Sequence, residues 1–334
     1  MRTTVLFLAM LLASVIAWAQ TNPAPAQTQQ NPGSASTPGA QSPGTPPSQA
    51  QPSAPSQTAP ATGTHRMLQA KSQDELKAYQ EAITKTDPAQ AEAAANDFAT
   101  KFPDSELRAA LYMRAMNMYA QANNSDKVID MGRKAIAADP INPVPLMEVG
   151  STLAETTRDS DLDREQRLAE AAKDANAAID NIDTGLLVPA NADPERVAGA
   201  KRTILTNSYA TLAMVDMDRS DYSAAVGNLQ KAINDTKDNP EAVLYLRLSV
   251  AQDKLKEYQQ ALDSANKAVQ YAKPGTPAEN LSKQQQERLQ KLINAESSGA
   301  TGAQSGPPTP GQPTPLSGSQ AGPPSLPGQS TPPH

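Results

Sequence analysis

An internal repeat of 36 residues is the feature of this chain that most restricts its fold. Six side chains of the first copy return in the same order and spacing: Tyr209, Leu212, Tyr222, Ala225, Lys231 and Ala232 recur as Tyr245, Leu248, Tyr258, Ala261, Lys267 and Ala268. A period of roughly 20 to 50 residues is typical of a solenoid, in which each unit buries its apolar face against its neighbours. The repeat therefore predicts a stack of similar units.

The first 19 residues have the pattern of an export signal. Arg2 precedes an apolar run from Val5 to Ala17, and Ala17-Trp18-Ala19 offers the small residues that a signal peptidase accepts. The run is short for a membrane span, although an uncleaved anchor is the alternative. We expect residues 1–19 to be removed, leaving no membrane span, and the product to be exported to the periplasm or secreted. The chain has no cysteine, which excludes disulfides and a lipid-modified amino terminus.

Two segments have the composition of disordered chain. Residues 20–66 and 298–334 are rich in Pro, Gln, Ser, Thr and Gly, and Asp, Glu and Lys are absent from both. Such segments cannot bury enough apolar surface to offset the entropy lost on ordering. We expect both to be disordered, proline-rich arms around a folded domain of residues 67–297.

The folded domain is acidic. It contains 27 Lys and Arg residues and 35 Asp and Glu residues, which gives a net charge of −8. A domain of this charge without a basic stripe is poorly suited to nucleic acid or to an anionic membrane surface. The expected partner is therefore a protein or peptide.

The folded domain reads as helix throughout. Helix starts are marked by a capping residue followed by proline, as at Asp87-Pro88, Asn142-Pro143, Asp193-Pro194, Asn239-Pro240 and Thr276-Pro277. Between these starts apolar residues recur at intervals of three and four. The pattern predicts helices at 72–85, 88–101, 105–121, 125–138, 143–156, 164–182, 194–219, 221–236, 240–255, 257–273 and 277–296.

These helices resemble the tetratricopeptide repeat, or TPR, a helix-turn-helix unit of about 34 residues. The last two units carry the resemblance best, through Tyr209, Leu212, Ala213, Tyr222 and Ala225 and then Tyr245, Leu248, Ser249, Tyr258 and Ala261. The resemblance implies an all-α, right-handed solenoid of about five helix pairs and a C-terminal capping helix. The units are expected at about 72–103, 105–140, 143–183, 194–238 and 240–274, with the cap at 277–296.

An inventory of reactive residues argues against catalysis. The two histidines, His65 and His334, lie in the proline-rich segments, and there is no cysteine. A Ser-His-Asp triad, a Cys-His pair and a histidine-ligated zinc site are therefore excluded from the folded domain. No glycine-rich phosphate loop is present. We expect a protein that is not an enzyme and that needs no cofactor.

One acidic segment partly matches a calcium loop. Asp159, Asp161, Asp163 and Glu170 follow the first, third, fifth and twelfth positions of that loop. Arg164 replaces the turn glycine, however, and Glu170 falls within a predicted helix. The other interpretation is a solvated insertion whose acids favour the start of that helix. The prediction is no metal site, with these four residues as an incomplete candidate.

The family resemblance implies that the first helices of the units line a concave groove. Carried over unit by unit, the groove positions are Leu76, Gln80, Ile83, Met113, Asn117, Gln121, Met147, Ser151, Ala210, Met214, Met217, Leu246 and Val250. Methionine adapts its shape to varied apolar partners. The prediction is a methionine-rich groove for an apolar segment. Lateral packing between neighbouring first helices is the alternative for each methionine.

The sequence thus predicts a non-enzymatic scaffold in the bacterial cell envelope that holds a protein or peptide in this groove. Two alternatives remain open. One is an envelope structural component that acts through its proline-rich segments. The other is a calcium-responsive binding protein that uses the insertion at 159–170.

Overall fold

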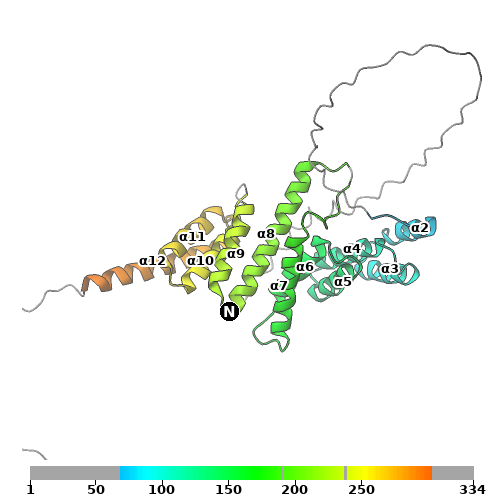
Figure 1. Ribbon diagram of the computed structural model, residues 1–334. Helices are drawn as coiled ribbons and strands as arrows, with labels where there is room; N and C mark the ends of the chain where they lie inside the picture. The colour runs from blue at the N-terminus through cyan, green and yellow to red at the C-terminus, as the bar shows by residue number, and fades with distance from the viewer. Residues whose placement is uncertain (1–67, 190, 237–238, 303–334) are drawn as a thin grey trace, which may run out of the picture. The chain divides into compact units, whose positions relative to one another are not determined.

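The computed structural model describes residues 68–302 except 190 and 237–238, with the backbone alone at 299–302. The expected signal peptide, the segment 20–66 and the tail beyond 302 lie outside the described residues. All regular elements in the described part are α-helices (Figure 1). They are α2 (Gln73–Ala82), α3 (Pro88–Lys101), α4 (Leu107–Gln121), α5 (Ser125–Ala138), α6 (Pro143–Thr156), α7 (Arg164–Asp180), α8 (Pro194–Asp218), α9 (Tyr222–Asp235), α10 (Ala242–Lys254), α11 (Tyr258–Tyr271) and α12 (Pro277–Gly302).

The chain divides into two compact units, residues 1–293 and 294–334. The helix packing below belongs to the first. In the second, the described residues continue α12, where Ser298 Oγ donates to the Asn294 carbonyl at 2.8 Å.

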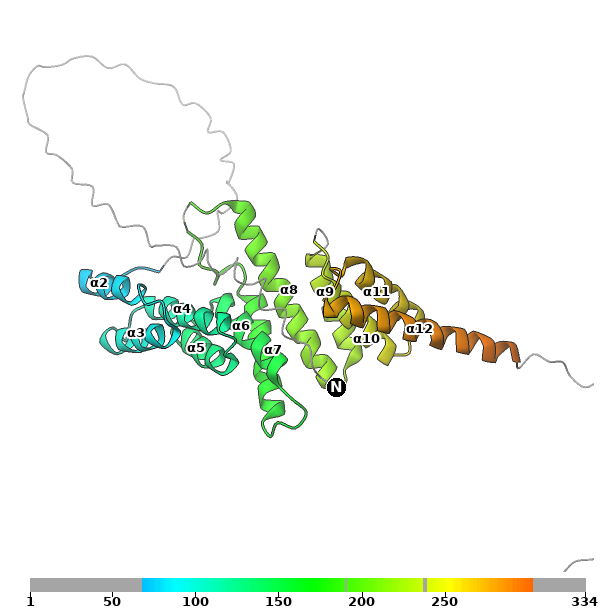
Figure 2. The ribbon, with the colours of Figure 1, turned by 180° about the vertical axis from the view of Figure 1, so that it is seen from behind.

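The helices of the first unit pack as consecutive pairs. The pairs are α2 with α3, α4 with α5, α6 with α7, α8 with α9, and α10 with α11; from the second pair onward the two helices of a pair contact each other extensively. The second helix of each pair then packs against the first helix of the next. Figures 1 and 2 show the pairs following one another in chain order. This is the helix-pair arrangement of a TPR-like solenoid, as the repeat predicted.

Local capping explains most of the helix starts. The side chains of Asp87, Asn142 and Asp193 each accept a hydrogen bond from a backbone N–H in the first turn, and a proline opens each of these helices. Ser72 caps α2 in the same way. These starts confirm the predicted capping pattern. Proline is tolerated at the first helical position because no backbone hydrogen bond is lost there.

The start of α10 differs from the prediction. The helix begins at Ala242 rather than at Pro240, and its N-cap, Glu241, makes no side-chain capping bond. The Asn239 N–H instead donates to the Thr236 carbonyl at 2.8 Å. Asn239 therefore closes the turn after α9 and does not cap α10.

The turns inside three helix pairs share one backbone conformation. Asn123, Ser220 and Lys256 have φ values of 55°, 63° and 63°, in the left-handed region. The next N–H in each turn reaches back five residues, from Asn124 to Tyr119, from Asp221 to Asp216 and from Glu257 to Gln252, each at 2.8 to 3.0 Å. This is the Schellman ending of a helix. The α6–α7 connection, residues 157–163, is longer and lacks a positive φ value among the described residues.

Small residues allow the helices to approach closely. A Cβ added at Gly132 of α5 would lie 2.2 Å from Val149 Cγ2 of α6. One added at Gly150 of α6 would lie 3.0 Å from the backbone oxygen of Ala171 in α7. Fully buried alanines allow the same close approach between other helices, for example Ala95, Ala225 and Ala265.

Helix α12 covers the last pair. Gln285 Nε2 donates to Ser249 Oγ of α10 at 3.4 Å, and Gln286 Nε2 donates to Asn266 Oδ1 of α11 at 2.7 Å. Leu289 is fully buried in a cluster with Ala261 and Ala265 of α11. The helix runs to Gly302, beyond the expected end at Glu296, since the first proline after its start is Pro307.

Candidate protein-binding face

Three consecutive first helices, α6, α8 and α10, carry charged, polar and partly accessible apolar side chains beside their buried apolar residues. In α10 the buried residues Leu244, Leu248 and Ala251 pack with α8 and α9 of the preceding pair, whereas Leu246 and Val250 lie on a different side of the helix and are half-buried. We define the first-helix face by these positions: Glu148, Ser151 and Glu155 of α6, Asn207 and Met214 of α8, and Leu246, Arg247 and Val250 of α10.

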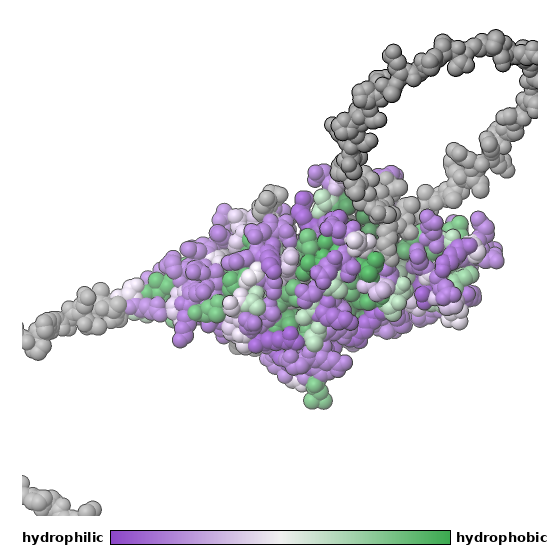
Figure 3. Space-filling model, viewed as in Figure 1, coloured by the Kyte–Doolittle hydropathy of each residue, from purple (hydrophilic) through white to green (hydrophobic). Residues whose placement is uncertain are grey.

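Contacts between these helices bring the residues of the face together. Asn207 Nδ2 of α8 lies 3.7 Å from Met147 Sδ of α6. Glu155 of α6 interacts electrostatically with Arg247 of α10. The surface view shows apolar residues gathered over α8 and toward α6, with polar residues around them (Figure 3). The face therefore spans three repeats and combines apolar with charged groups.

The predicted groove residues fall into three classes of exposure. Met113, Asn117, Met147 and Ala210 are buried. Seven are half-buried: Leu76, Ile83, Ser151, Met214, Met217, Leu246 and Val250. Gln80 and Gln121 are exposed. The groove assignment for the half-buried and exposed positions stays a prediction.

The two buried methionines contact the next repeat. Met113 Sδ of α4 lies 3.4 Å from Nδ2 of Asn142, the N-cap of α6, and Met147 Sδ makes the corresponding contact with Asn207 of α8. Both side chains are 2 % exposed. They lie where one repeat packs against the next, which is the lateral-packing alternative. Of the predicted methionines, Met214 and Met217 are the ones with partly accessible side chains.

Charged groups on the face have shifted pKa values. Burial, with a smaller effect of the nearby Glu155 charge, raises the pKa of Glu148 to about 7. Burial also raises the pKa of Glu155, against the opposing effects of Arg247 and of a hydrogen bond from Ser151. The pKa of Arg247 is lowered by burial, although Glu155 and Glu241 favour its charged form. These charges lie in surroundings that water solvates poorly.

Sequence reasoning missed the charged part of this face. Glu148 and Glu155 are seven residues apart with Ser151 between them, a spacing that places all three on one side of a helix. That spacing was a usable signal. No sequence signal predicts the contact of Glu155 with Arg247, which lies 92 residues further along the chain.

The residues of the partial calcium loop are not brought together. Glu170 lies inside α7, and both of its carboxylate oxygens accept hydrogen bonds from Arg133, at 2.7 and 2.6 Å. Asp161 accepts from the Arg158 N–H at 2.8 Å, and Asp159 pairs with Arg164 at 3.6 Å. Within residues 68–302, apart from the gaps, no group of three or more His, Cys, Asp or Glu side chains could hold a metal ion. The four acidic residues that partly match a calcium loop therefore do not converge on one point.

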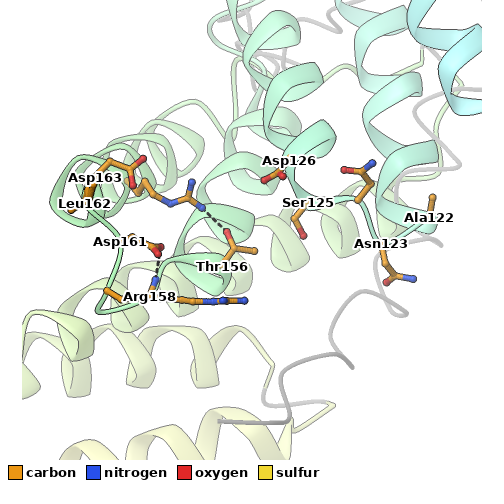
Figure 4. A pocket seen from close by; sticks show the side chains of 12 residues that line it. Ala122, Asn123, Ser125, Asp126, Thr156, Arg158, Asp161, Leu162 and Asp163 are labelled. Carbon is orange, nitrogen blue, oxygen red and sulfur yellow. Dashed lines mark hydrogen bonds between the residues drawn. The ribbon is translucent and has the colours of Figure 1, made fainter.

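A polar pocket lies beside this loop. Its volume is about 910 Å³, and Figure 4 shows Ser125 and Asp126 at the start of α5 facing Thr156, Asp161 and neighbouring loop residues. Arg167, also in the lining, is held by hydrogen bonds to Thr156 and Thr157. Leu162, at the tip of the loop, is fully exposed. The lining mixes three aspartates with two arginines and therefore favours neither sign of charge.

Among the described residues, no helix is both long enough and apolar enough to cross a membrane.

Comparisons with known proteins give only distant likenesses. No family model and no curated protein matches the sequence. Among solved structures, MamA protein is 15% identical, with 61% of this chain and 97% of that chain covered and a TM-score of 0.36. PilW, described as a widely conserved type IV pilus biogenesis factor, is 17% identical, with coverages of 63% and 98% and a TM-score of 0.33.

A third solved structure, the assembly chaperone of RpL4 (Acl4), is 12% identical, with 67% of this chain and 98% of that chain covered and a TM-score of 0.33. Likenesses at this level carry no argument about function. The assignment of the fold therefore rests on this chain's own helix pairs and on the turn conformation that three of them share. By these features, the described part of the chain is an all-helical, TPR-like solenoid.

Proposed function

We propose that this protein is a non-catalytic scaffold of the cell envelope that binds an apolar segment of another protein on its first-helix face. The observation that carries the proposal is the pair Leu246 and Val250 of α10. Both are apolar and half-buried, on a side of α10 other than the one that packs against α8 and α9. Met214 of α8 adds a third partly accessible apolar side chain.

The cell-envelope part of the proposal rests on the sequence. The signal-like segment 1–19 predicts export, and the absence of cysteine suits an oxidising compartment that would otherwise pair thiols. The absence of catalysis rests on the inventory of reactive residues in the folded domain.

Site-specific photocrosslinking in the full-length protein tests the binding face. A benzoylphenylalanine at Val250 is expected to crosslink to a partner in the envelope, whereas one at Leu281 of α12 is not. Leu281 is the matched control because it is an apolar helical side chain, 44% exposed, outside the face. Leu246→Asp should abolish the crosslink at position 250, since burying a carboxylate in an apolar contact is costly.

The alternative in which the proline-rich segments carry the function gives a different result. If deletion of residues 20–66 and 303–334 removes the crosslink at position 250 while Leu246→Asp does not, the first-helix face is not the binding surface. If the crosslink survives the deletion, the face binds without those segments.

A further inference from the structure

The carboxylate of Glu148 is buried without a compensating partner. The side chain is 8% exposed, and its Oε2 makes no hydrogen bond. Leaving a carboxylate oxygen unpaired in a protein interior is costly, and most buried polar atoms in folded proteins have a partner. A donor group from a ligand on the first-helix face would satisfy this acceptor.

A second carboxylate lies near it on the same side of α6. Glu155 follows Glu148 by seven residues, which is two helical turns, and the two groups interact electrostatically. Ser151, between them in the sequence, donates a hydrogen bond to Glu155. Two poorly solvated carboxylates that repel each other are both stabilised when a cation is placed between them.

Within the described residues, little positive charge acts on these carboxylates. Arg247 is the cation that acts on Glu155, but it also interacts with Glu241 of α10. No cation contributes to the shifted pKa of Glu148, whose causes are burial and the charge of Glu155. One guanidinium is therefore shared between two carboxylates, and the third, Glu148, is left uncompensated.

We propose that the apolar segment bound on the first-helix face carries a lysine or arginine whose charged end is held between Glu148 and Glu155. This inference rests on the proposed function and specifies the chemistry of the partner. The aliphatic stem of the basic residue would lie along apolar side chains such as Met214 and Val250, while its N–H groups reach the carboxylates. The cation would provide the donor that Glu148 Oε2 lacks.

Matched synthetic peptides test the inference with the full-length protein. The first is rich in leucine and alanine and has one central lysine. In the second and third, glutamine or glutamate replaces that lysine. We expect the lysine peptide to bind at least about tenfold more tightly than the glutamine peptide. A poorly solvated ion pair with a hydrogen bond contributes more binding free energy than a tenfold difference in affinity requires. The glutamate peptide should bind more weakly than either. Fluorescence anisotropy of labelled peptides gives the affinities.

Two substitutions locate the effect. Glu148→Gln combined with Glu155→Gln should reduce the preference for lysine over glutamine to about onefold, without weakening the glutamine peptide. Glu106→Gln, which removes one negative charge at an exposed position, is the control and should leave the preference unchanged. The thermal midpoint of each variant reports whether the fold is retained.

The outcomes separate the two proposals. If the glutamine peptide binds, and Leu246→Asp abolishes this binding, but lysine brings no gain, then the face binds apolar segments and the inference about the basic residue is wrong. If none of the peptides binds, both the inference and the proposed binding face are wrong. A lysine preference that survives loss of both carboxylates also overturns the inference.

Discussion

The ammonium group of Lys231 lies 5.2 Å from the ring centroid of Tyr209, and the repeat reproduces this relationship. Lys267 lies 5.7 Å from the ring of Tyr245, and Lys134 lies 5.9 Å from the ring of Tyr112. In each case the lysine follows the tyrosine by 22 residues and comes from the second helix of the same pair. Part of the repeated sequence pattern is thus a cation–π contact between paired helices.

Replacing the lysine of such a pair should cost little stability. We expect Lys267→Met to lower the free energy of unfolding by about 0.5 kcal/mol, because the lysine is exposed and water screens the interaction. Urea denaturation measures the change. Lys77→Met, at an exposed position of α2, is the control, and an equal loss there would argue against a specific contact.

Glycine at the left-handed turn should stabilise the last pair. Lys256 has a φ value of 63°, where a side chain costs roughly 1 kcal/mol that glycine avoids. Lys256→Gly should therefore raise the free energy of unfolding by about 1 kcal/mol. Lys254→Gly, two residues earlier and still helical, should lower it by a similar amount. A loss in both variants would contradict the turn assignment.

Gly132 and Gly227, both within helices, should respond oppositely to alanine. Gly132→Ala places a methyl group against Val149 and should destabilise the protein by about 1 to 3 kcal/mol, as overpacking does. At Gly227 of α9 nothing lies within 4 Å of the added Cβ, and alanine favours helix, so Gly227→Ala should stabilise by about 0.5 to 1 kcal/mol. Thermal and urea unfolding of both variants decides; stabilisation by Gly132→Ala would refute the close approach of α5 and α6.

The stability penalty from Glu148 should grow as the pH rises. The pKa of Glu148 is raised from 4.5 to about 7 in the folded protein, mainly by burial. Between these values the folded state binds more protons at this group than the unfolded state does, so this group's contribution to stability falls with increasing pH. Below 4.5 both states are protonated and the penalty vanishes. Above about 7 it reaches its maximum, on the order of 3 kcal/mol.

Glu148→Gln removes this titration. The free energy of unfolding of the variant, minus that of the wild type, should therefore increase from pH 4.5 to 7 and stay level above that. Glu106→Gln, at an exposed position, should show no such rise. A difference for Glu148→Gln that does not change with pH would mean that Glu148 titrates normally.

Calcium should leave the protein unchanged. Arg133 occupies both oxygens of Glu170, Asp161 accepts from the Arg158 N–H, and Asp159 pairs with Arg164. We expect the thermal midpoint to be the same with millimolar calcium and with a chelator. A midpoint raised by calcium would restore the ion-binding interpretation of the insertion.

Local sequence signals were enough for the helices. The capping side chains of Ser72, Asp87, Asn142 and Asp193 act on backbone groups two or three residues away, so short windows of sequence contain the whole interaction. The predicted start of α10 was wrong because the Asn239 N–H closes the preceding turn. The capping rule does not take that turn into account.

The 36-residue repeat determined that helices pack in pairs and that the pairs stack, because each amphipathic unit must bury its apolar face against the next. It also fixed the tyrosine and lysine positions that meet within a pair. The tertiary structure decided which first-helix side chains remain accessible. Met113 and Met147 are buried against the following repeat, whereas Met214 and Val250 are not, and Glu148 and Glu155 share a face with Arg247. These outcomes depend on how neighbouring repeats are placed against each other. That placement results from many contacts between residues distant in sequence.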